Sequence, residues 1–153
     1  MSGATMTLSP QQVAERCAAA MWPDDRAAQG LGISLVRVAP GEAVARMTVR
    51  EDMVNGHDIC HGGFIFALAD SAFAYACNTF NVRTVASGVD INFIAPAHKG
   101  QTLTAHGHAR HQGGRSGVYD IEVKNEQDEL IAVFRGRSTR IKGHFFDEGE
   151  AHA

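Results

Sequence analysis

The most constraining feature of the sequence is a long apolar stretch that contains a single charge. Residues 64–69 and 72–77 are apolar on every side of a helix, and Asp70 is the only ionisable residue between them. A helix that is apolar all round has to be covered all round. The pattern therefore predicts a helix over 62–79 in the middle of the fold.

A second helix is predicted near the N-terminus, over 10–21. Ser9 has the side chain of an N-cap, Pro10 suits the first helical position, and Gln12 completes a capping box. The Trp-Pro-Asp-Asp sequence at 22–25 ends this helix, because a residue before proline disfavours helical backbone.

The rest of the chain is predicted to form β-strands separated by short turns. Apolar and polar side chains alternate over 43–49, and this period of two indicates a sheet with one buried face. Strands are expected over 32–38, 43–49, 84–94, 102–112, 118–124 and 130–141. Short connections imply antiparallel neighbours, so the predicted fold class is α+β, with one antiparallel sheet wrapped around the central helix. We expect a single domain over 1–153, with its core at about 10–143 and a loose tail at 144–153.

Such a sheet leaves its other face uncovered in a single chain. Surplus apolar surface of this kind is normally buried against another subunit. The pattern predicts a homodimer or a homotetramer, and the sequence leaves open which of the two forms.

Composition and residue spacing argue against several classes of function. A net charge of -3 argues against nucleic acid as a partner. Three cysteines without CxxC spacing suggest buried reduced thiols, and no signal peptide or membrane-spanning stretch is present, so a cytoplasmic protein with no membrane association is expected. His57 and His61 straddle the expected loop–helix junction without a third ligand, so no metal site is predicted.

Asp70 is the first candidate for chemistry. Burial of an unpaired carboxylate costs several kcal/mol, so such a group normally has a partner or a task. In the structural interpretation Asp70 caps or pairs with a neighbouring loop, and in the functional one it is catalytic.

The sequence His61-Gly62-Gly63 at the start of the central helix is the second candidate. The first helical turn leaves backbone N–H groups unpaired, and glycine lets a ligand approach them. Such a terminus favours developing negative charge, for example on the oxygen of a thioester carbonyl under attack. The alternative is that the glycines only permit a tight loop-to-helix junction.

The spacing of these two candidates adds a constraint. Gly62 and Asp70 are eight residues apart, roughly 12 Å along a helix. A nucleophile and its oxyanion donor must both lie about 3 Å from one reacting group. Two chains satisfy this requirement if a two-fold axis sets Gly62 of one beside Asp70 of the other.

The turn at 110–117 is basic and rich in glycine. Together with Lys99 and Arg137 it is a candidate for contact with the phosphates of a nucleotide-like carrier. As a hairpin turn it needs no function.

These motifs resemble the hotdog-fold acyl-CoA thioesterases, most closely the type that takes part in phenylacetic acid degradation. The resemblance lies in the spacing Asn55-x5-His61-Gly62-Gly63-x6-Asp70, in the strand 85–93 and in the turn that begins at Arg110. It extends over about residues 10–143.

The resemblance implies a role for each candidate. The Gly62 N–H, assisted by Asn55, polarises the thioester carbonyl, and Asp70 of the second subunit attacks it or activates a water. His61 positions the thioester or the loop. Ser87 helps to orient the water, although the family's hydroxyl position falls on Thr84 in a slightly shifted alignment.

The resemblance also implies where the substrate lies. Coenzyme A is part of the substrate, so no cofactor is expected, and its phosphates lie near the hairpin while the acyl group enters between the helices. The expected substrate-binding residues are Gly63, Phe66, Phe73, Arg110, His111, Gly113, Arg115 and Ser116.

The expected activity is hydrolysis of phenylacetyl-CoA or hydroxyphenylacetyl-CoA. One alternative is a hotdog hydratase or dehydratase acting on enoyl thioesters, for which His61 and Asp70 are available. A second alternative is a non-catalytic acyl-CoA-binding module, against which the presence of Asp70 argues. The sequence leaves open the preferred acyl group, and also whether Asp70 acts as nucleophile or general base.

Overall fold

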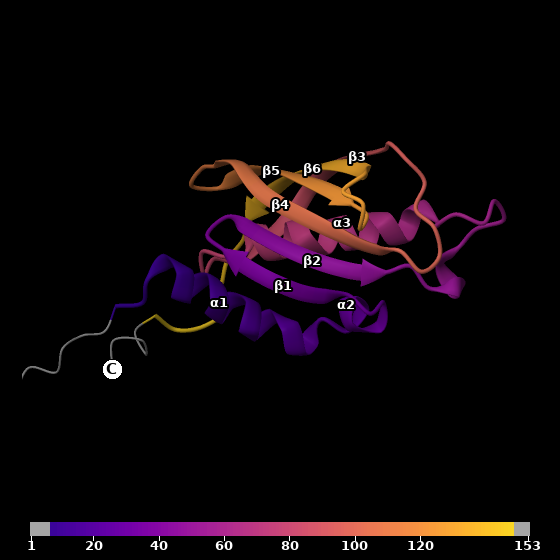
Figure 1. The fold of residues 1–153 in the computed structure, drawn as a ribbon. Coiled ribbons are helices and arrows are strands. Elements are labelled where there is room, and N and C mark those ends of the chain that lie inside the picture. Colours follow the sequence, from indigo (N-terminus) through magenta and orange to yellow (C-terminus); the bar gives the residue numbers. More distant parts are fainter. Residues whose placement is uncertain (1–6, 149–153) are drawn as a thin grey trace, which may run out of the picture.

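A curved antiparallel sheet around a central helix forms the body of the protein (Figure 1), and the computed structural model describes residues 7–148. The six strands lie in the order β1-β2-β4-β5-β6-β3, which confirms the predicted α+β class. Their bounds are β1 (Ser34–Ala39), β2 (Glu42–Thr48), β3 (Thr84–Phe93), β4 (Thr102–Gln112), β5 (Ser116–Lys124) and β6 (Leu130–Arg140).

Both predicted helices are present. Helix α1 (Pro10–Met21) begins with the predicted capping box, in which Ser9 Oγ accepts from the N–H of Gln12 at 3.1 Å and Gln12 Oε1 accepts from the N–H of Ser9 at 2.8 Å. Helix α3 (Gly62–Cys77) ends two residues earlier than predicted.

Within residues 7–148, three short helical segments were not predicted. They are η1 (Trp22–Asp24), α2 (Arg26–Gly30) and η2 (Glu51–Met53). The sequence at 22–25 does end α1, but Asp25 then caps α2, because its Oδ1 accepts from the N–H of Ala28 at 3.2 Å.

Helix α3 packs against the concave face of the sheet through large side chains. Leu68 and Phe73 are fully buried, and the Phe73 ring lies 5.8 Å, centroid to centroid, from both Tyr119 and Phe134. Gly136 allows this close approach, since a Cβ at that position would lie 2.6 Å from the Phe73 ring.

One side of α3 is not covered, contrary to the expectation of a helix enclosed all round. Apart from Gly62 and Phe64 in the first turn, the residues that remain half-buried or exposed recur every three or four positions, as on one face of a helix. We call this face the open stripe; it consists of Gly63, Phe66, Ala67, Asp70, Ser71 and Ala74. The sheet curves around α3 without closing over this side.

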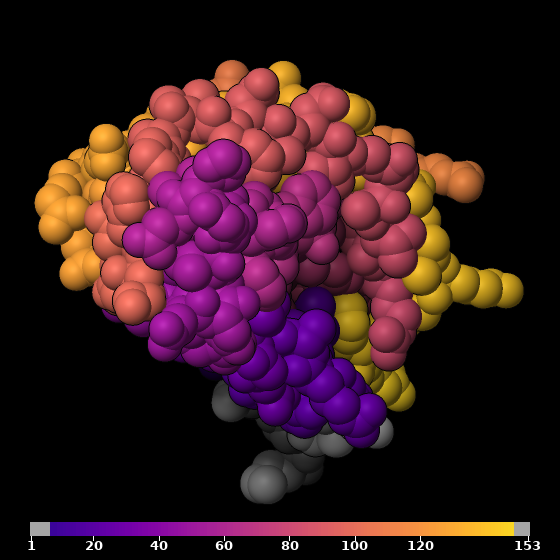
Figure 2. Space-filling model, turned by 90° about the vertical axis from the view of Figure 1, so that its right-hand side faces the viewer, coloured from indigo at the N-terminus to yellow at the C-terminus, as the bar shows by residue number. Residues whose placement is uncertain are grey.

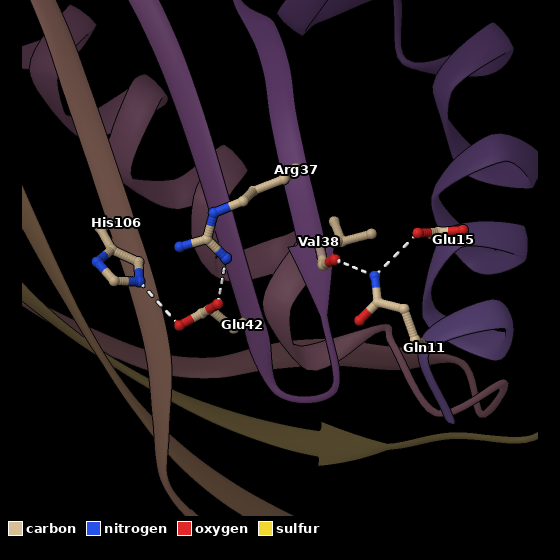
Figure 3. A network of polar contacts seen from close by, with 6 residues as sticks. All are labelled: Gln11, Glu15, Arg37, Val38, Glu42 and His106. Atoms are coloured by element: carbon tan, nitrogen blue, oxygen red, sulfur yellow. Dashed lines mark hydrogen bonds and ion pairs between the residues drawn. The ribbon is translucent and has the colours of Figure 1, made fainter. Parts of the chain in front are cut away.

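The outer face of the sheet is charged, so the prediction of surplus apolar surface there is wrong. Glu42 bridges Arg37 and His106 across three strands, and these contacts hold the pKa of the Glu42 carboxyl below its usual range (Figure 3). Further along, Asp120 pairs with Arg135 at 2.7 Å. Exposed pairs of this kind add little stability. Their effect is to keep this face hydrated.

The apolar surface lies instead at the edge formed by β3. Among the described residues β3 pairs only with β6, so its other edge carries unpaired N–H and C=O groups. Val85 and Phe93 are 43% and 53% exposed, although both are large and apolar. A long edge strand with exposed apolar side chains is a template for pairing with another chain.

The beginning of the predicted loose tail is held against the domain. Asn81 Oδ1 accepts from the N–H of Phe145 at 2.9 Å and of Phe146 at 3.2 Å, and its Nδ2 donates to the Phe146 carbonyl at 3.0 Å. Arg16 of α1 lies over the Phe146 ring at 4.3 Å. The core thus extends beyond residue 143, whereas 149–153 lie outside the described residues.

Candidate active site

The start of α3 presents one unpaired backbone donor. His61 is the N-cap: its Nδ1 accepts from the N–H of Gly63 at 2.9 Å, and its carbonyl accepts from the N–H of Phe64 at 3.0 Å. Within residues 7–148 no acceptor takes the N–H of Gly62. Among the described residues, the first turn therefore leaves one backbone donor without a partner, the N–H of Gly62, and this donor lies at the positive end of the helix dipole.

A tight loop holds Asn55 beside this donor. Asn55 Oδ1 accepts from the N–H of His57 at 2.9 Å and of Ile59 at 3.4 Å, and the Asn55 N–H donates to the Ile59 carbonyl at 2.8 Å. Asp58 completes the loop with φ of 61°, a left-handed conformation that aspartate tolerates. The Asn55 amide nitrogen keeps no partner among the described residues, so its N–H groups are free to donate.

Asn55 and Gly62 open into one apolar hollow of about 580 Å³. Its walls include Ile59, Ile65 and Phe93. Figure 2 faces this end of the molecule and shows the surface hollowed between the magenta loop before α3 and the red segment around β3. An apolar hollow with two donors in its wall suits an acyl group whose carbonyl oxygen needs stabilisation.

Asp70 lies on the open stripe of α3, half-buried. No hydrogen bond or ion pair to any described residue satisfies its carboxylate, so the alternative in which it caps or pairs with a loop is wrong for this part of the chain. Burial raises the pKa of the Asp70 carboxyl above its usual value, since desolvation disfavours the charged form. A carboxylate with a raised pKa is a stronger base and remains accessible from the side that the sheet leaves open.

The structure does not bring Gly62 and Asp70 of one chain together. Both lie on α3 as predicted, eight residues apart, which is roughly 12 Å along the axis. The hollow beside Gly62 does not include Asp70 among its lining residues. One chain thus carries the two halves of a site at separate places.

The two candidate hydroxyl groups differ in accessibility. Ser87 is exposed at an irregularity of β3, and its Oγ donates to the Arg137 carbonyl at 3.1 Å. Thr84 is buried, and its hydroxyl donates to the Val82 carbonyl at 2.8 Å. Only the Ser87 hydroxyl is therefore in a position to meet a water or a substrate.

The predicted acyl contacts are met only in part. Phe66 is half-buried on the open stripe, with its ring 5.5 Å from that of Phe134. Phe73 is 1% exposed beneath Gly136, so the prediction that it contacts the acyl group is wrong. Phe73 lies on the side of α3 that packs against the sheet, and a sequence that is apolar on every side of the helix does not show which side that is.

The hairpin between β4 and β5 lies near the other end of α3. The backbone of the turn closes by a bond from the Gly113 N–H to the Ser116 carbonyl at 2.8 Å, and Arg110 pairs with Asp120 at 3.6 Å. The predicted phosphate-contacting residues here are His111, Gly113, Arg115 and Ser116, all at the surface or partly so. They do not meet Gly62 or Gly63 of the same chain, because these lie at the opposite end of α3 (Figure 1).

Lys99 and Arg137, the other two basic residues predicted to contact phosphates, lie in different parts of the chain. Lys99 lies in the turn before β4, at the far end of that strand from the hairpin, so it does not meet the hairpin of the same chain. Arg137 stands opposite Val118 near the hairpin and pairs with Asp90 at 3.1 Å.

Sequence reasoning missed two contributors to this region. Gln112 anchors the hairpin, because its Nε2 donates to the Gly113 carbonyl at 2.8 Å and its Oε1 accepts from the Tyr119 hydroxyl at 2.6 Å. Phe93 lies against Gly62 in the hollow. The period-two alternation through Val89 and Ile91 places Phe93 on the inner face, and this signal could have identified it.

None of the helices within residues 7–148 has the length and apolarity needed to span a membrane.

Comparison with known proteins gives consistent matches. The family model described as Thioesterase superfamily matches residues 57–132. The chain is 51% identical over 124 residues to the acyl-coenzyme A thioesterase PaaI of Escherichia coli, which covers 81% of this chain and 89% of that protein. It is 32% identical over 139 residues to a putative esterase of Archaeoglobus fulgidus, covering 91% of this chain and 90% of that protein.

Solved structures agree with this assignment. The E. coli PaaI protein from the phenylacetic acid degradation operon superposes with a TM-score of 0.87 at 48% identity, covering 89% of this chain and 99% of that chain. The TT0310 protein of Thermus thermophilus gives a TM-score of 0.74 at 38% identity, covering 76% of this chain and 98% of that chain. With the same fold, a matching family model and a relative 51% identical over most of its length, the chain belongs to the hotdog-fold thioesterase superfamily.

Proposed function

We propose that the protein hydrolyses acyl-CoA thioesters to the free acid and coenzyme A. The observation that carries this proposal is a pair of groups on α3, the N–H of Gly62 and the carboxylate of Asp70, neither of which has a hydrogen-bond partner within residues 7–148. The first suits a developing oxyanion, and the second suits proton transfer or attack. Identity of 51% to an acyl-coenzyme A thioesterase supports the same reaction class.

The complete site is formed by two subunits in this proposal. Two-fold pairing through the apolar edge of β3 places a second α3 over the open stripe, antiparallel to the first. The Gly62 N–H of one subunit then faces the partner subunit's Asp70, and each dimer contains two equivalent sites. A homodimer is the smallest assembly that completes the chemistry, and a homotetramer is a pair of such dimers.

The chemical steps follow from these positions. The Gly62 N–H and the Asn55 amide stabilise negative charge on the carbonyl oxygen as the thioester carbon is attacked. In one route Asp70 takes a proton from water, which attacks the carbon, while Ser87 orients that water. In the other, Asp70 attacks and forms a mixed anhydride, which water then hydrolyses. In both, the C–S bond breaks, the coenzyme A thiolate is protonated and the carboxylic acid is released. The reaction needs no cofactor beyond the coenzyme A of the substrate.

The proposed substrates are phenylacetyl-CoA and hydroxyphenylacetyl-CoA. The similarity to a PaaI protein from a phenylacetic acid degradation operon supports an arylacetyl group. The nucleotide phosphates lie at the hairpin, where Arg110, Arg115 and the glycine-rich backbone offer donors. We place the reaction in the cytoplasm, and the three buried free cysteines fit such a reducing compartment.

The test is release of coenzyme A thiol from phenylacetyl-CoA by the wild-type protein and by Asp70→Asn. We expect release by the wild type and a loss of at least about a hundredfold in the variant. Equal rates would remove Asp70 from the mechanism. Saturable binding without release from any acyl-CoA would indicate a binding module, and hydration of an enoyl-CoA without release would indicate a hydratase.

A further inference from the structure

Phe93 lies directly against Gly62, the residue whose N–H is the donor of the candidate site. It is the last residue of β3, and one of its ring carbons lies 2.9 Å from the place where a Cβ on Gly62 would lie. Glycine is therefore required at position 62 for the ring to lie so close to the start of α3. In the single chain Phe93 is nevertheless 53% exposed, and it forms part of the wall of the apolar hollow.

The other aromatic residues expected near the acyl group are less well placed. Phe73 is enclosed beneath the sheet, and Phe66 packs its ring against Phe134. Neither lines the hollow that contains Asn55 and Gly62. Within the described residues, Phe93 supplies the aromatic ring of that hollow.

We propose that Phe93 determines acyl specificity, by providing the surface against which an arylacetyl group packs. This inference rests on the proposed function. A carbonyl oxygen that accepts from the Gly62 N–H lies about 3 Å from that nitrogen. Because the Phe93 ring is in contact with Gly62, the carbons attached to that carbonyl lie beside the ring.

The chemistry of the hollow explains why selectivity depends on this residue. Ile59, Ile65 and Ile94 are aliphatic, and their surfaces accept an alkyl chain as readily as a ring. An aromatic wall adds an offset or edge-to-face contact that an alkyl group cannot reproduce.

The experiment compares kcat/KM for phenylacetyl-CoA with kcat/KM for hexanoyl-CoA in Phe93→Leu. We expect the ratio to fall about three- to tenfold relative to the wild type, the size of one lost aromatic contact. Phe93→Tyr keeps the ring and should keep the ratio. Ile94→Leu is the matched control, since it changes an exposed aliphatic side chain of the same hollow.

The ratio is insensitive to loss of folded protein, because misfolding lowers both rates alike. An unchanged ratio in Phe93→Leu, with hydrolysis still dependent on Asp70, overturns the role of Phe93 and leaves the proposed function intact. If Ile94→Leu lowers the ratio of the two kcat/KM values equally, the role of Phe93 is overturned as well, because any residue of the hollow then has the same effect. Absence of hydrolysis in every protein, the wild type included, overturns both proposals together.

Discussion

The His61 imidazole accepts a hydrogen bond from the backbone N–H of Gly63 at 2.9 Å and thereby closes the first turn of α3, whereas no acceptor in the described part of the chain takes the Gly62 N–H. The residue that was expected to position the thioester or the loop is thus the N-cap of the central helix. This bond requires an unprotonated Nδ1. His61 selects which donor of the turn remains available.

The capping role predicts the behaviour of two His61 variants. His61→Ala removes the acceptor and should cost about 1 kcal/mol of stability. His61→Asn keeps a side-chain acceptor at the N-cap and should lie within a few tenths of a kcal/mol of the wild type. Denaturant unfolding measures both, and equal losses in the two variants would show that the imidazole contributes by packing instead.

Replacement of Asp70 is expected to have opposite effects on activity and on stability. Its raised pKa means that the folded protein holds the proton more tightly than the unfolded chain, so ionisation of Asp70 lowers stability. Asp70→Asn should therefore be inactive yet slightly more stable at pH 7. Since Asp70 is only partly buried, solvent screens much of the effect, and we expect a gain in Tm of roughly 1–2 °C.

The pH dependence follows with a definite sign. The stability advantage of Asp70→Asn over the wild type should be absent below about pH 4, where both states of the wild type are protonated. It should grow as the pH rises through the pKa of the folded state and stay constant above it. In the wild type, activity should rise over the same range as the carboxylate forms. Thermal unfolding at several pH values checks the first trend, and a pH profile of kcat/KM checks the second.

The N–H of Gly62 can be tested by a pair of substitutions. Gly62→Ala and Gly62→Pro both place a Cβ against Phe93, but only proline removes the N–H. Proline is tolerated at the first helical position, and the backbone of His61 is already extended, as a residue before proline requires. We expect kcat of Gly62→Pro to be about 10²–10³-fold below that of Gly62→Ala. Gly56→Ala in the preceding loop meets no atom within 4 Å and should retain wild-type activity.

The sequence predicted the elements whose causes are local. The capping box at Ser9, the period-two strands and the glycine-led start of α3 each depend on neighbouring residues alone. The open stripe could not be predicted, because an apolar residue such as Ala67 or Ala74 gives the same signal whether the sheet or a second chain covers it. The same reason explains the error at Phe73, which faces the sheet. The charged outer face was also missed, because alternation shows that one face is polar without showing where the apolar surplus lies.

Substitutions of Asn81 test how the C-terminal segment contributes to stability. It is 2% exposed with φ of 58°, and its side chain holds the backbone of Phe145 and Phe146. Asn81→Gly loses these bonds but relieves the left-handed backbone, whereas Asn81→Ala loses them and adds strain. We expect Asn81→Ala to be less stable than Asn81→Gly by about 1 kcal/mol, and both to lie below the wild type. Urea unfolding of the three proteins distinguishes these contributions.

If each active site is formed by two subunits, activity should return when two inactive variants are mixed. Asp70→Asn keeps the Gly62 donor, and Gly62→Pro keeps the carboxylate. In a mixed dimer one site combines Gly62 of the first protein with Asp70 of the second and is intact, while the other site carries both changes. With random pairing, half of the dimers are mixed, so about a quarter of the wild-type sites should be restored.

The measurement is thiol release after the two variants are dissociated, mixed and allowed to reassociate. Asp70→Asn mixed with the double variant Asp70→Asn/Gly62→Pro is the control, since no pairing restores a site there. If mixed dimers form, as differently tagged subunits would reveal, and activity does not return, the two groups do not cooperate across the interface. If activity returns near the expected fraction, Asp70 and Gly62 of different chains serve one site, and a chain kept monomeric should be inactive with every residue intact.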